Sequence, residues 1–250
     1  MPDSPYKLLA LYYDQLFEPL RRPMGRARRQ ILGDILKRTT AACDLACGTG
    51  TTAVELARRG IRMFALDASP AMCRLARRKA RASGVRVRVL RGDMRSFRLP
   101  EAVDLVTCEF DALNHVPRRS DLNRVARAVA RALKPGGYFF FDVNHRRAFE
   151  KVWTGTWWHE LPGVVLVMHG GYDRRRRKGW SNAEWFVQKG KSWRRSSERI
   201  EEVAWTATEI RQSLRRAGFG KIQSWDEAPF VPEWKIPPGF RTVYLAQKAR

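Results

Sequence analysis

The fold is decided by the stretch Cys43-Asp44-Leu45-Ala46-Cys47-Gly48-Thr49-Gly50. The apolar run over residues 41–46 predicts a short buried strand, and residues 51–59 continue as a helix. Gly48 and Gly50 permit backbone angles and close approaches that other residues disfavour. The stretch therefore predicts a strand, a tight turn and a helix, with a ligand lying against the turn and the start of the helix.

Strands and helices alternate on both sides of this turn. Further strands are predicted at residues 61–66, 85–90, 103–108, 138–143, 221–226 and 241–247. The strand at residues 85–90 alternates apolar residues with arginine, which predicts a half-buried edge strand. Helices are predicted at residues 6–18, 21–38, 70–82, 120–134 and 206–217, the first two separated by a proline-containing joint. This alternation predicts an α/β fold, with a mostly parallel sheet covered by helices on both faces.

The alternation breaks between residues 146 and 205. Three strand-like runs there, at residues 164–172, 180–187 and 193–203, predict an antiparallel β insertion between the fifth strand and the last helix. Seven of the nine tryptophans of the chain lie in this segment. Alternate residues of a strand share a face, so the insertion could form an aromatic lid over an acceptor pocket. The core of a thin sheet or a dimer interface would explain the same tryptophans.

The chain is strongly basic, with 48 Lys and Arg against 25 Asp and Glu and a net charge of +23. Such a charge favours polyanions, so nucleic acid is a possible partner. The basic residues are spread along the chain, which favours solvated helix faces instead. The oligomeric state is not predicted.

The remaining composition predicts a soluble, cytoplasmic protein. No apolar run approaches the roughly 20 residues of a membrane-spanning helix, and the first residues do not resemble a secretory signal. The four cysteines form no zinc-type pairs, so we expect buried free thiols and no metal site.

Polar residues follow several of the predicted strands, at the sheet edge where open α/β folds bind ligands. Asp67 closes the second strand and could accept both ribose hydroxyls of an adenosine. Asp93 and Met94 follow the third strand, where they could bind and cover an adenine. Residues 109–115 follow the fourth strand. Residues 48–53 also satisfy the loose dinucleotide pattern G-x-G-x-x-A, so a nicotinamide-dependent oxidoreductase is an alternative.

Taken in order, these segments resemble the class I S-adenosylmethionine-dependent methyltransferases. The resemblance rests on Asp44 to Gly50, Asp67, Gly92-Asp93-Met94, Glu109 to His115 and Lys134-Pro135-Gly136-Gly137. The segment Tyr12-Tyr13-Asp14 resembles the N-terminal lid of members that act on small molecules. The resemblance implies a Rossmann-like sheet of seven strands and S-adenosylmethionine as the cofactor.

The resemblance also implies roles for individual residues. Ala46, Cys47, Gly48 and Gly50 would lie against the methionine part of the cofactor, with Asp44 orienting its amino group. Asp67, with Ala68 beside it, would hold the ribose, and Asp93 and Met94 the adenine. Glu109 and Phe110 would lie beside the methionine, and Tyr13 would close over the cofactor. Many members have glycine where this chain has Ala46.

The implied organisation is a single domain over residues 1–250. Residues 1–40 would form a helical lid, 41–145 the cofactor-binding core, 146–205 the antiparallel acceptor-side insertion and 206–250 the closing helix and strands.

The implied reaction is methyl transfer by in-line displacement to an oxygen or nitrogen atom of a small-molecule acceptor. His115 is the first candidate for a general base, because an ordinary histidine pKa lies near neutrality, and His145 is the second. Methylation of RNA through the basic surface is the alternative.

Overall fold

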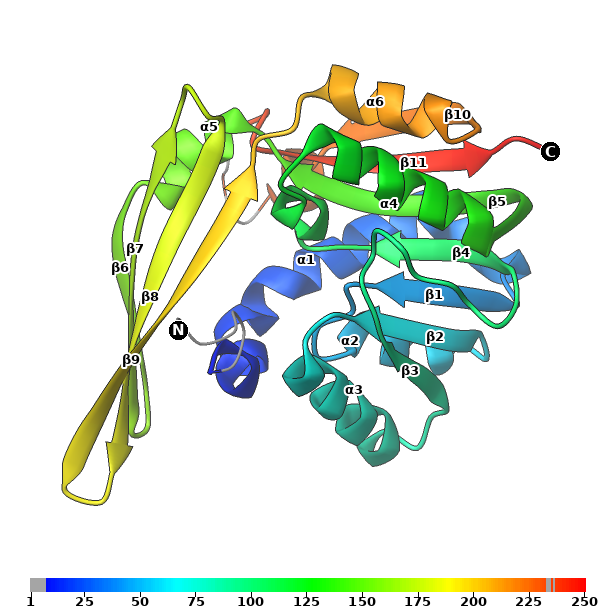
Figure 1. Cartoon of the computed structure of the whole chain (residues 1–250). Coiled ribbons are helices and arrows are strands. Elements are labelled where there is room, and N and C mark those ends of the chain that lie inside the picture. The colour runs from blue at the N-terminus through cyan, green and yellow to red at the C-terminus, as the bar shows by residue number, and fades with distance from the viewer. Residues whose placement is uncertain (1–7, 233–234, 236) are drawn as a thin grey trace.

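The structure is a computed structural model that describes residues 8–232, 235 and 237–250. In these residues, seven strands form the central sheet: β1 (Ala41–Leu45), β2 (Arg62–Asp67), β3 (Val87–Arg91), β4 (Val103–Cys108), β5 (Leu133–Asn144), β10 (Phe219–Asp226) and β11 (Arg241–Lys248). Their spatial order is β10-β11-β5-β4-β1-β2-β3 (Figure 1). β3 lies at an edge of the sheet, as its half-buried pattern predicts.

The strand directions distinguish this sheet from the dinucleotide-binding fold. β1 to β5 pair in parallel, whereas β11 pairs antiparallel with both β5 and β10. The dinucleotide-binding order places a sixth parallel strand directly after the fifth. The observed order, with an antiparallel strand next to β5, therefore argues against the nicotinamide alternative.

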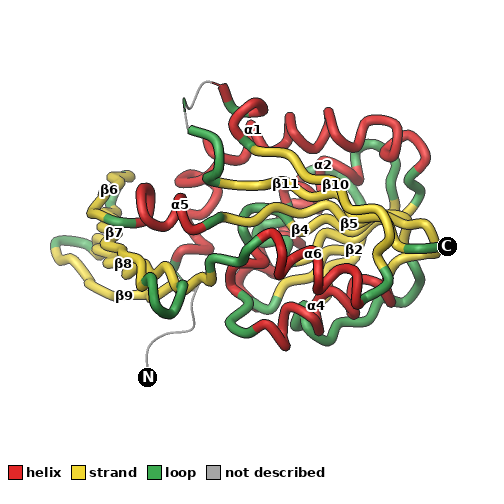
Figure 2. The backbone as a smooth tube through the Cα atoms, turned by 90° about the horizontal axis from the view of Figure 1, so that it is seen from above, coloured by secondary structure: helices red, strands yellow, loops and turns green. Residues whose placement is uncertain are grey.

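Helices cover both faces of this sheet (Figure 2). α1 (Leu9–Arg38), α2 (Thr51–Ala57) and α3 (Pro70–Ala82) pack on one face, and α4 (Arg119–Ala132) and α6 (Ala207–Arg216) pack on the other. Short helical segments lie at η1 (Ala112–His115), α5 (Arg146–Ala148), η2 (Phe149–Trp153) and η3 (Ala228–Phe230). The predicted fold class is confirmed. Of the helices that the structure describes, none combines the length and apolar character needed to cross a membrane.

The N-terminal helix differs from the prediction. One continuous helix, α1, replaces the two predicted helices and runs through Pro19 and Pro23, while residues 6 and 7 lie outside the described part of the chain. Each proline removes one helical hydrogen bond. The helix continues because both of its ends are anchored. Its first half packs on the insertion through Leu9 and Leu16, and its second half packs on the central sheet through Leu32.

The insertion is a separate antiparallel sheet of four strands, all within the described residues: β6 (Gly155–Leu161), β7 (Val164–Asp173), β8 (Lys178–Lys189) and β9 (Ser192–Val203). The prediction of three strands was wrong, since it missed β6. Neighbours Trp157 and Trp158 are both exposed, so β6 lacks the alternation that marks a half-buried strand. Figure 1 shows this sheet beyond the carboxyl ends of the parallel strands, with the start of α1 beside it.

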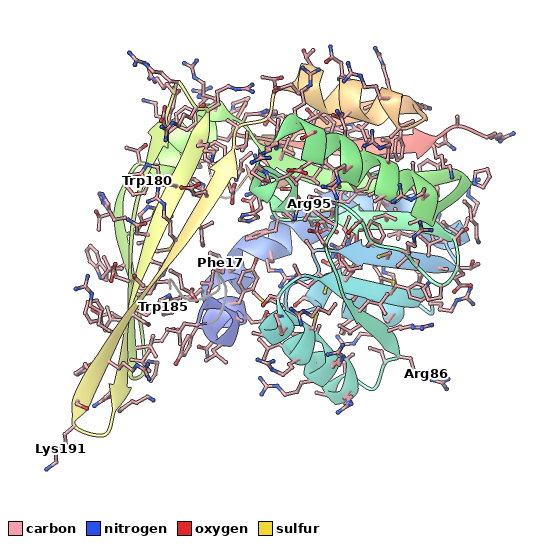
Figure 3. All side chains as sticks on the ribbon, in the orientation of Figure 1. Phe17, Arg86, Arg95, Trp180, Trp185 and Lys191 are labelled. Carbon is pink, nitrogen blue, oxygen red and sulfur yellow. The ribbon has the colours of Figure 1, made fainter. Side chains whose placement is uncertain are left out.

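The tryptophans of the insertion divide between a core and the surface. Trp185, which is labelled in Figure 3, is fully buried. Its ring stacks on that of Tyr12 of α1, with the ring centroids 5.6 Å apart. Trp205 is buried in the core of the central sheet and donates a hydrogen bond to the carbonyl of Leu113. Trp158 and Trp193 are 68% and 51% exposed. Two of these tryptophans thus hold the structure together rather than lining a shared aromatic surface.

Candidate active site

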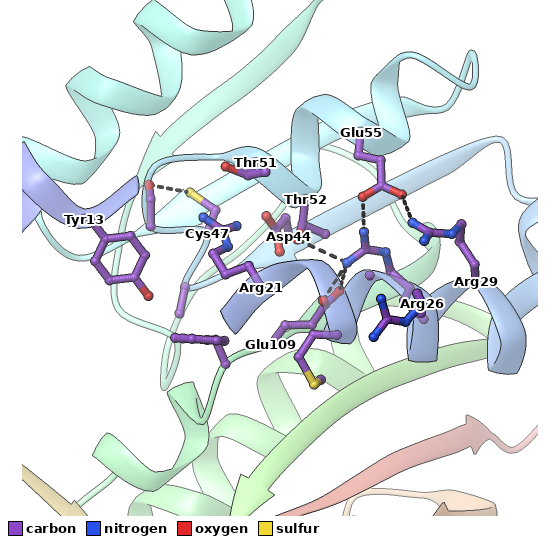
Figure 4. Close-up of a pocket in the computed structure, with 16 residues that line it drawn as sticks. Tyr13, Arg21, Arg26, Arg29, Asp44, Cys47, Thr51, Thr52, Glu55 and Glu109 are labelled. Carbon is purple, nitrogen blue, oxygen red and sulfur yellow. Dashed lines mark hydrogen bonds and ion pairs between the residues drawn. The ribbon is translucent and has the colours of Figure 1, made fainter. Parts of the chain in front are cut away.

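A pocket of about 340 Å³ lies where the turn after β1 meets α1 (Figure 4). The residues that line it come from the turn and α2, from α1 and from the segment after β4. The lining residues are Tyr13, Arg21, Met24, Gly25, Arg26, Arg28, Arg29, Asp44, Ala46, Cys47, Gly48, Thr51, Thr52, Glu55, Glu109 and Phe110. The pocket therefore opens beyond the carboxyl ends of the central strands, where the sequence predicts a ligand.

The turn has a left-handed backbone at three positions. Ala46, Gly48 and Gly50 have φ values of 54°, 54° and 81°. A Cβ atom on Gly48 would have no heavy atom within 4 Å, so the space beside this residue is open to a ligand. A Cβ on Gly50 would lie 2.9 Å from the Cβ of Ala76, so glycine lets α2 and α3 pack closely.

Asp44 is buried at the end of β1. Its Oδ1 accepts a hydrogen bond of 2.9 Å from the Thr107 hydroxyl, whereas its Oδ2 has no hydrogen-bond partner among the described residues. Burial, together with the nearby charge of Glu109, raises the pKa of Asp44 to about 7. The pocket thus contains a carboxylate oxygen that lacks a partner and would accept a positively charged donor.

Arg28 of α1 crosses the pocket wall and is only 2% exposed. Its guanidinium forms ion pairs with Glu55 of α2 and with Glu109, whose Oε2 lies 2.5 Å from Nη1, and it donates to the Thr52 hydroxyl. The Nε–H of Arg28 is buried without a partner in the part of the chain that the structure describes. Burial raises the pKa of Glu109, and the charge of Arg28 opposes this shift.

The first half of α1 is tied to the turn by polar contacts. The Thr49 hydroxyl donates to Asp14 at 2.6 Å, and the ammonium of Lys79 lies 2.6 Å from the same carboxylate. Arg21 donates to the Thr49 hydroxyl. Tyr13 lines the pocket, and burial raises the pKa of its hydroxyl, so the phenol is neutral. At the start of α1, Glu198 of β9 accepts hydrogen bonds from backbone N–H groups.

The predicted ribose and adenine residues lie outside the pocket lining. Asp67 closes β2 and accepts from the N–H groups of Gly48 and Ser69, so it borders the turn and fixes its shape. Asp93 is paired with Arg95 through two hydrogen bonds of 2.9 Å from the Arg95 Nε. Met94 packs against the core of the central sheet. Gly50 and Ala68 do not line the pocket either.

The segment after β4 holds a strained backbone. Phe110 and Asp111 have φ values of 66° and 54°, a region costly for residues other than glycine. Both N–H groups donate to the carboxylate of Asp142 at the end of β5, at 2.6 and 2.8 Å. Asp142 therefore stabilises the conformation that places Phe110 in the pocket.

Beside this segment lies a group of four buried or half-buried carboxylates around Arg241, which we call the acidic cluster. Arg241 contacts Asp111, Asp142 and Glu227 at 2.9, 3.2 and 3.5 Å, and Glu202 of β9 completes the group. Burial raises the pKa of each of these carboxyl groups, that of Asp111 to about 7.

The two histidines proposed as bases occupy different surroundings. His115 lies at the acidic cluster, its Nε2 3.4 Å from a Glu202 oxygen, and burial lowers its pKa to about 4. That value makes it a weak base, far from the neutral pKa on which its prediction rested. Both ring nitrogens of His145 are engaged, with the Trp205 carbonyl at 3.2 Å and the Thr242 hydroxyl at 2.7 Å. His145 therefore joins β5, β11 and the end of the insertion, and its proposed role as a base is not supported by this geometry.

The pocket brings together seven of the predicted site residues: Tyr13, Asp44, Ala46, Cys47, Gly48, Glu109 and Phe110. Sequence reasoning missed the arginines that α1 contributes to the pocket, above all Arg21 and Arg28. No motif marks these arginines, because they lie in a helix that carries many basic residues. The polar residues Thr51, Thr52 and Glu55 of α2 follow the glycine turn directly, so their place at a helix start was a signal that could have identified them.

Parts of the chain are similar in sequence to known methyltransferases. Residues 42–137 match a family described as a methyltransferase domain. The ubiquinone biosynthesis O-methyltransferase of Serratia proteamaculans (strain 568) is 35% identical over 169 residues, which cover 64% of this chain and 65% of that enzyme. The corresponding enzyme of Yersinia pestis (strain Pestoides F) is 32% identical, with 62% and 64% covered. The chain thus matches slightly less than two thirds of the length of these relatives.

Solved structures extend the likeness to the whole fold. An S-adenosylmethionine-dependent methyltransferase from Clostridium acetobutylicum ATCC 824 superimposes with a TM-score of 0.82 at 24% identity, over 98% of this chain and 99% of that chain. A sugar N-methyltransferase from Streptoalloteichus sp. ATCC 53650 superimposes with a TM-score of 0.72 at 20% identity, over 94% and 93%. At these identities the likeness shows a shared fold, including the antiparallel insertion.

Proposed function

We propose that this chain is a class I S-adenosylmethionine-dependent methyltransferase and that it transfers the methyl group of this cofactor to an oxygen or nitrogen atom of a small molecule. The observation that carries the proposal is the unpartnered Oδ2 of Asp44, buried in the wall of the pocket. The names of the relatives, O-methyltransferases and a sugar N-methyltransferase, support a small-molecule acceptor of either kind.

The charged groups of the pocket fit the amino-acid end of the cofactor. An ammonium group would bind the free Oδ2 of Asp44, and a carboxylate would bind the unpartnered Nε–H of Arg28. Each of these atoms is buried without a partner among the described residues, so such a ligand would satisfy two costly polar groups at once. A zwitterionic amino-acid group carries both the ammonium that Asp44 would bind and the carboxylate that Arg28 would bind.

The turn would hold the rest of the cofactor. The open space beside Gly48 admits close backbone contact, and Asp67 lies next to it at the position that suits a ribose. We keep Asp93 and Met94 as proposed adenine contacts. In the structure, both carboxylate oxygens of Asp93 accept hydrogen bonds from Arg95. The assignment therefore requires the Asp93 side chain to release at least one of these hydrogen bonds and to turn toward the ligand.

The bound cofactor supplies an activated methyl group on a sulfonium sulfur. The chain's own contribution is to position the reactants: Phe110 packs beside the pocket, and Tyr13 and Arg21 of α1 cover it and exclude water. Positioning of this kind contributes at most about 7–11 kcal/mol to catalysis. A general base is needed only where the acceptor must lose its proton before it attacks, whereas a neutral amine attacks first and then releases its proton to solvent. The weak basicity of His115 is consistent with that mechanism.

We also propose the predicted division of labour within the chain. The described part of residues 1–40 would act as the lid, residues 41–145 as the cofactor core, and residues 146–205 as the acceptor side. The contacts of α1 with both sheets support it, because this helix touches the turn through Asp14 and the insertion through Tyr12.

The direct test is a comparison of ligands in thermal denaturation. S-adenosylhomocysteine at one hundred times its dissociation constant should stabilise the protein by about 2.7 kcal/mol, which corresponds to a rise in Tm of roughly 5–10 °C. NAD and NADP should leave Tm unchanged. Stabilisation by the dinucleotides and not by S-adenosylhomocysteine would reject the proposal.

RNA methylation is the second candidate, because one surface depression is lined by five arginines: Arg95, Arg98, Arg124, Arg127 and Arg131. If this surface serves the reaction, RNA should bind with a steep salt dependence and should compete with a small-molecule acceptor. Tight binding of RNA that persists with S-adenosylhomocysteine present, together with methylation of that RNA, would favour the second candidate over the first.

A further inference from the structure

Two members of the acidic cluster form, together with His115, a group of side chains that the proposed methyl transfer does not use. Asp111 follows β4, His115 ends η1, and Glu202 lies near the end of β9 in the insertion. One potential ligand atom from each residue lies within 4.8 Å of those of the other two. Residues from the cofactor core and from the insertion thus converge on one point.

Arg241 is shared by several carboxyl groups at this point. Four carboxylates surround the guanidinium of Arg241, which forms ion pairs with three of them. Arg241 and Asn144 both donate to the same oxygen of Asp111, its Oδ2, at 2.9 and 2.6 Å. Glu202 is the member of this group for which no ion pair with Arg241 is seen among the described residues.

Glu202 provides an independent indication of a ligand. This residue is only 3% exposed, and its Oε2 has no hydrogen-bond partner among the residues described. Its other oxygen lies 3.4 Å from the Nε2 of His115. A buried carboxylate oxygen without a donor is costly, so an unfilled partner is expected at this position.

The spacing of the candidate ligand atoms can be compared with that expected around a metal ion and around an ammonium group. Two ligands at about 2.1 Å from a tetrahedral metal lie about 3.4 Å apart. Two acceptors at about 2.8 Å from one ammonium nitrogen lie about 4.6 Å apart. The 3.4 Å between His115 Nε2 and Glu202 Oε1 is close to the spacing of two metal ligands, and each candidate ligand atom lies within 4.8 Å of the other two.

We propose that Asp111, His115 and Glu202 bind a divalent metal ion such as Zn²⁺ or Mn²⁺. Mixed carboxylate and imidazole ligands suit these ions. His115 also hydrogen-bonds the backbone of Glu201, and a second contact of this kind commonly orients a metal-bound histidine. This proposal departs from the expectation from the sequence that the chain has no metal site.

The proposed metal site is open to solvent and would leave a coordination position for a further ligand. The side chains of Asp111 and His115 are 16% and 29% exposed, so an ion can reach them from solvent. Three protein ligands leave at least one coordination position open, which water or an oxygen of the acceptor can occupy. The metal would in this way join the insertion to the core and mark the acceptor side of the pocket.

Cobalt serves as the probe, because Co²⁺ in such a site has visible absorption bands. The full chain, without an affinity tag and treated with EDTA, is titrated with CoCl₂, and Zn²⁺ binding is measured by calorimetry. We expect one ion per chain and a rise in Tm. Glu202→Gln should weaken binding by at least about tenfold. Glu201→Gln is the matched control, because this neighbour lies on the same strand and pairs at the surface with Arg199 and Lys178.

Several results would contradict the proposed metal site. Equal metal binding by wild type and Glu202→Gln, or no binding at millimolar metal, would overturn it. Stabilisation by methylammonium but not by metals would also overturn it and would assign the site to an ammonium group. His115→Gln provides a second variant. S-adenosylhomocysteine binding by every variant verifies that the chain is folded, so failure of the metal site is distinguishable from failure of the proposed methyl transfer.

Discussion

Replacement of Asp44 by Asn tests how the pocket would recognise the cofactor. The substitution keeps the shape of the side chain and an oxygen that can accept from Thr107, but it removes the negative charge. A hydrogen bond to a charged group contributes about 1.5–3 kcal/mol, so the Kd for S-adenosylhomocysteine should rise about 10- to 150-fold. Isothermal titration calorimetry measures this change. Asp34→Asn is the control, because Asp34 is an exposed aspartate of the same chain.

The pH dependence provides a second, independent readout. Burial and the charge of Glu109 raise the pKa of Asp44 to about 7, so about one tenth of the carboxyl groups is ionised at pH 6 and about nine tenths at pH 8. Only the ionised form would bind an ammonium group. The affinity of the wild-type protein should therefore rise about tenfold between pH 6 and pH 8, whereas that of Asp44→Asn should stay constant.

The raised pKa of Asp44 also makes the stability of the ligand-free protein depend on pH. A carboxyl group whose folded pKa is raised stabilises the fold below its unfolded pKa, and this contribution is lost as the pH rises through the folded value. Between pH 4 and pH 8, wild type should lose stability relative to Asp44→Asn, by on the order of 4 kcal/mol. Urea denaturation at both pH values measures the difference. Binding by Asp44→Asn within twofold of wild type, with the same pH profile, would refute the reasoning.

Two further substitutions test the packing around the pocket. Arg28→Met should lower the free energy of unfolding by about 3–5 kcal/mol, since it leaves Glu109 buried without its partner. The double variant Arg28→Met/Glu109→Gln should lose less stability than the single variant. Urea denaturation of the wild type and both variants measures these differences, and an unchanged midpoint for Arg28→Met would contradict the prediction. Trp185→Ala should cost about 3–5 kcal/mol because the side chain is fully buried between the insertion and α1. Trp193→Ala, at an exposed position of the same sheet, should stay within about 0.5 kcal/mol of wild type, so equal losses in the two variants would show that the assigned core is wrong.

Local patterns in the sequence were sufficient for most of the fold. The glycine turn, the alternating strands and helices and the start of α6 each depend on residues within a few positions of one another. Thr206 and Glu209, for example, form a capping box that begins the predicted helix. Strand β6 escaped prediction because its side chains lack alternating burial, and the division of α1 into two helices was wrong because packing at both ends outweighs its prolines.

The candidate site was predictable only where its residues belong to the turn or to strand ends. Asp44, Gly48 and Phe110 were found in this way, since parallel strands bring their carboxyl ends to one edge of the sheet. No local pattern could predict that Arg28 reaches Glu109, because the two residues are 81 positions apart and meet only when α1 packs across the sheet.

The sequence by itself determined the class of the protein and the loop that would bind its cofactor, because both are encoded in short-range spacing. Tertiary structure alone decided the chemical state of the site residues. Burial made His115 a weak base and raised the pKa of Asp44, and the packing of β11 and the insertion engaged both nitrogens of His145. It also brought Glu202 beside Asp111 and His115. Desolvation and long-range contacts exist only in the folded chain, so their effects cannot be deduced from spacing along the sequence.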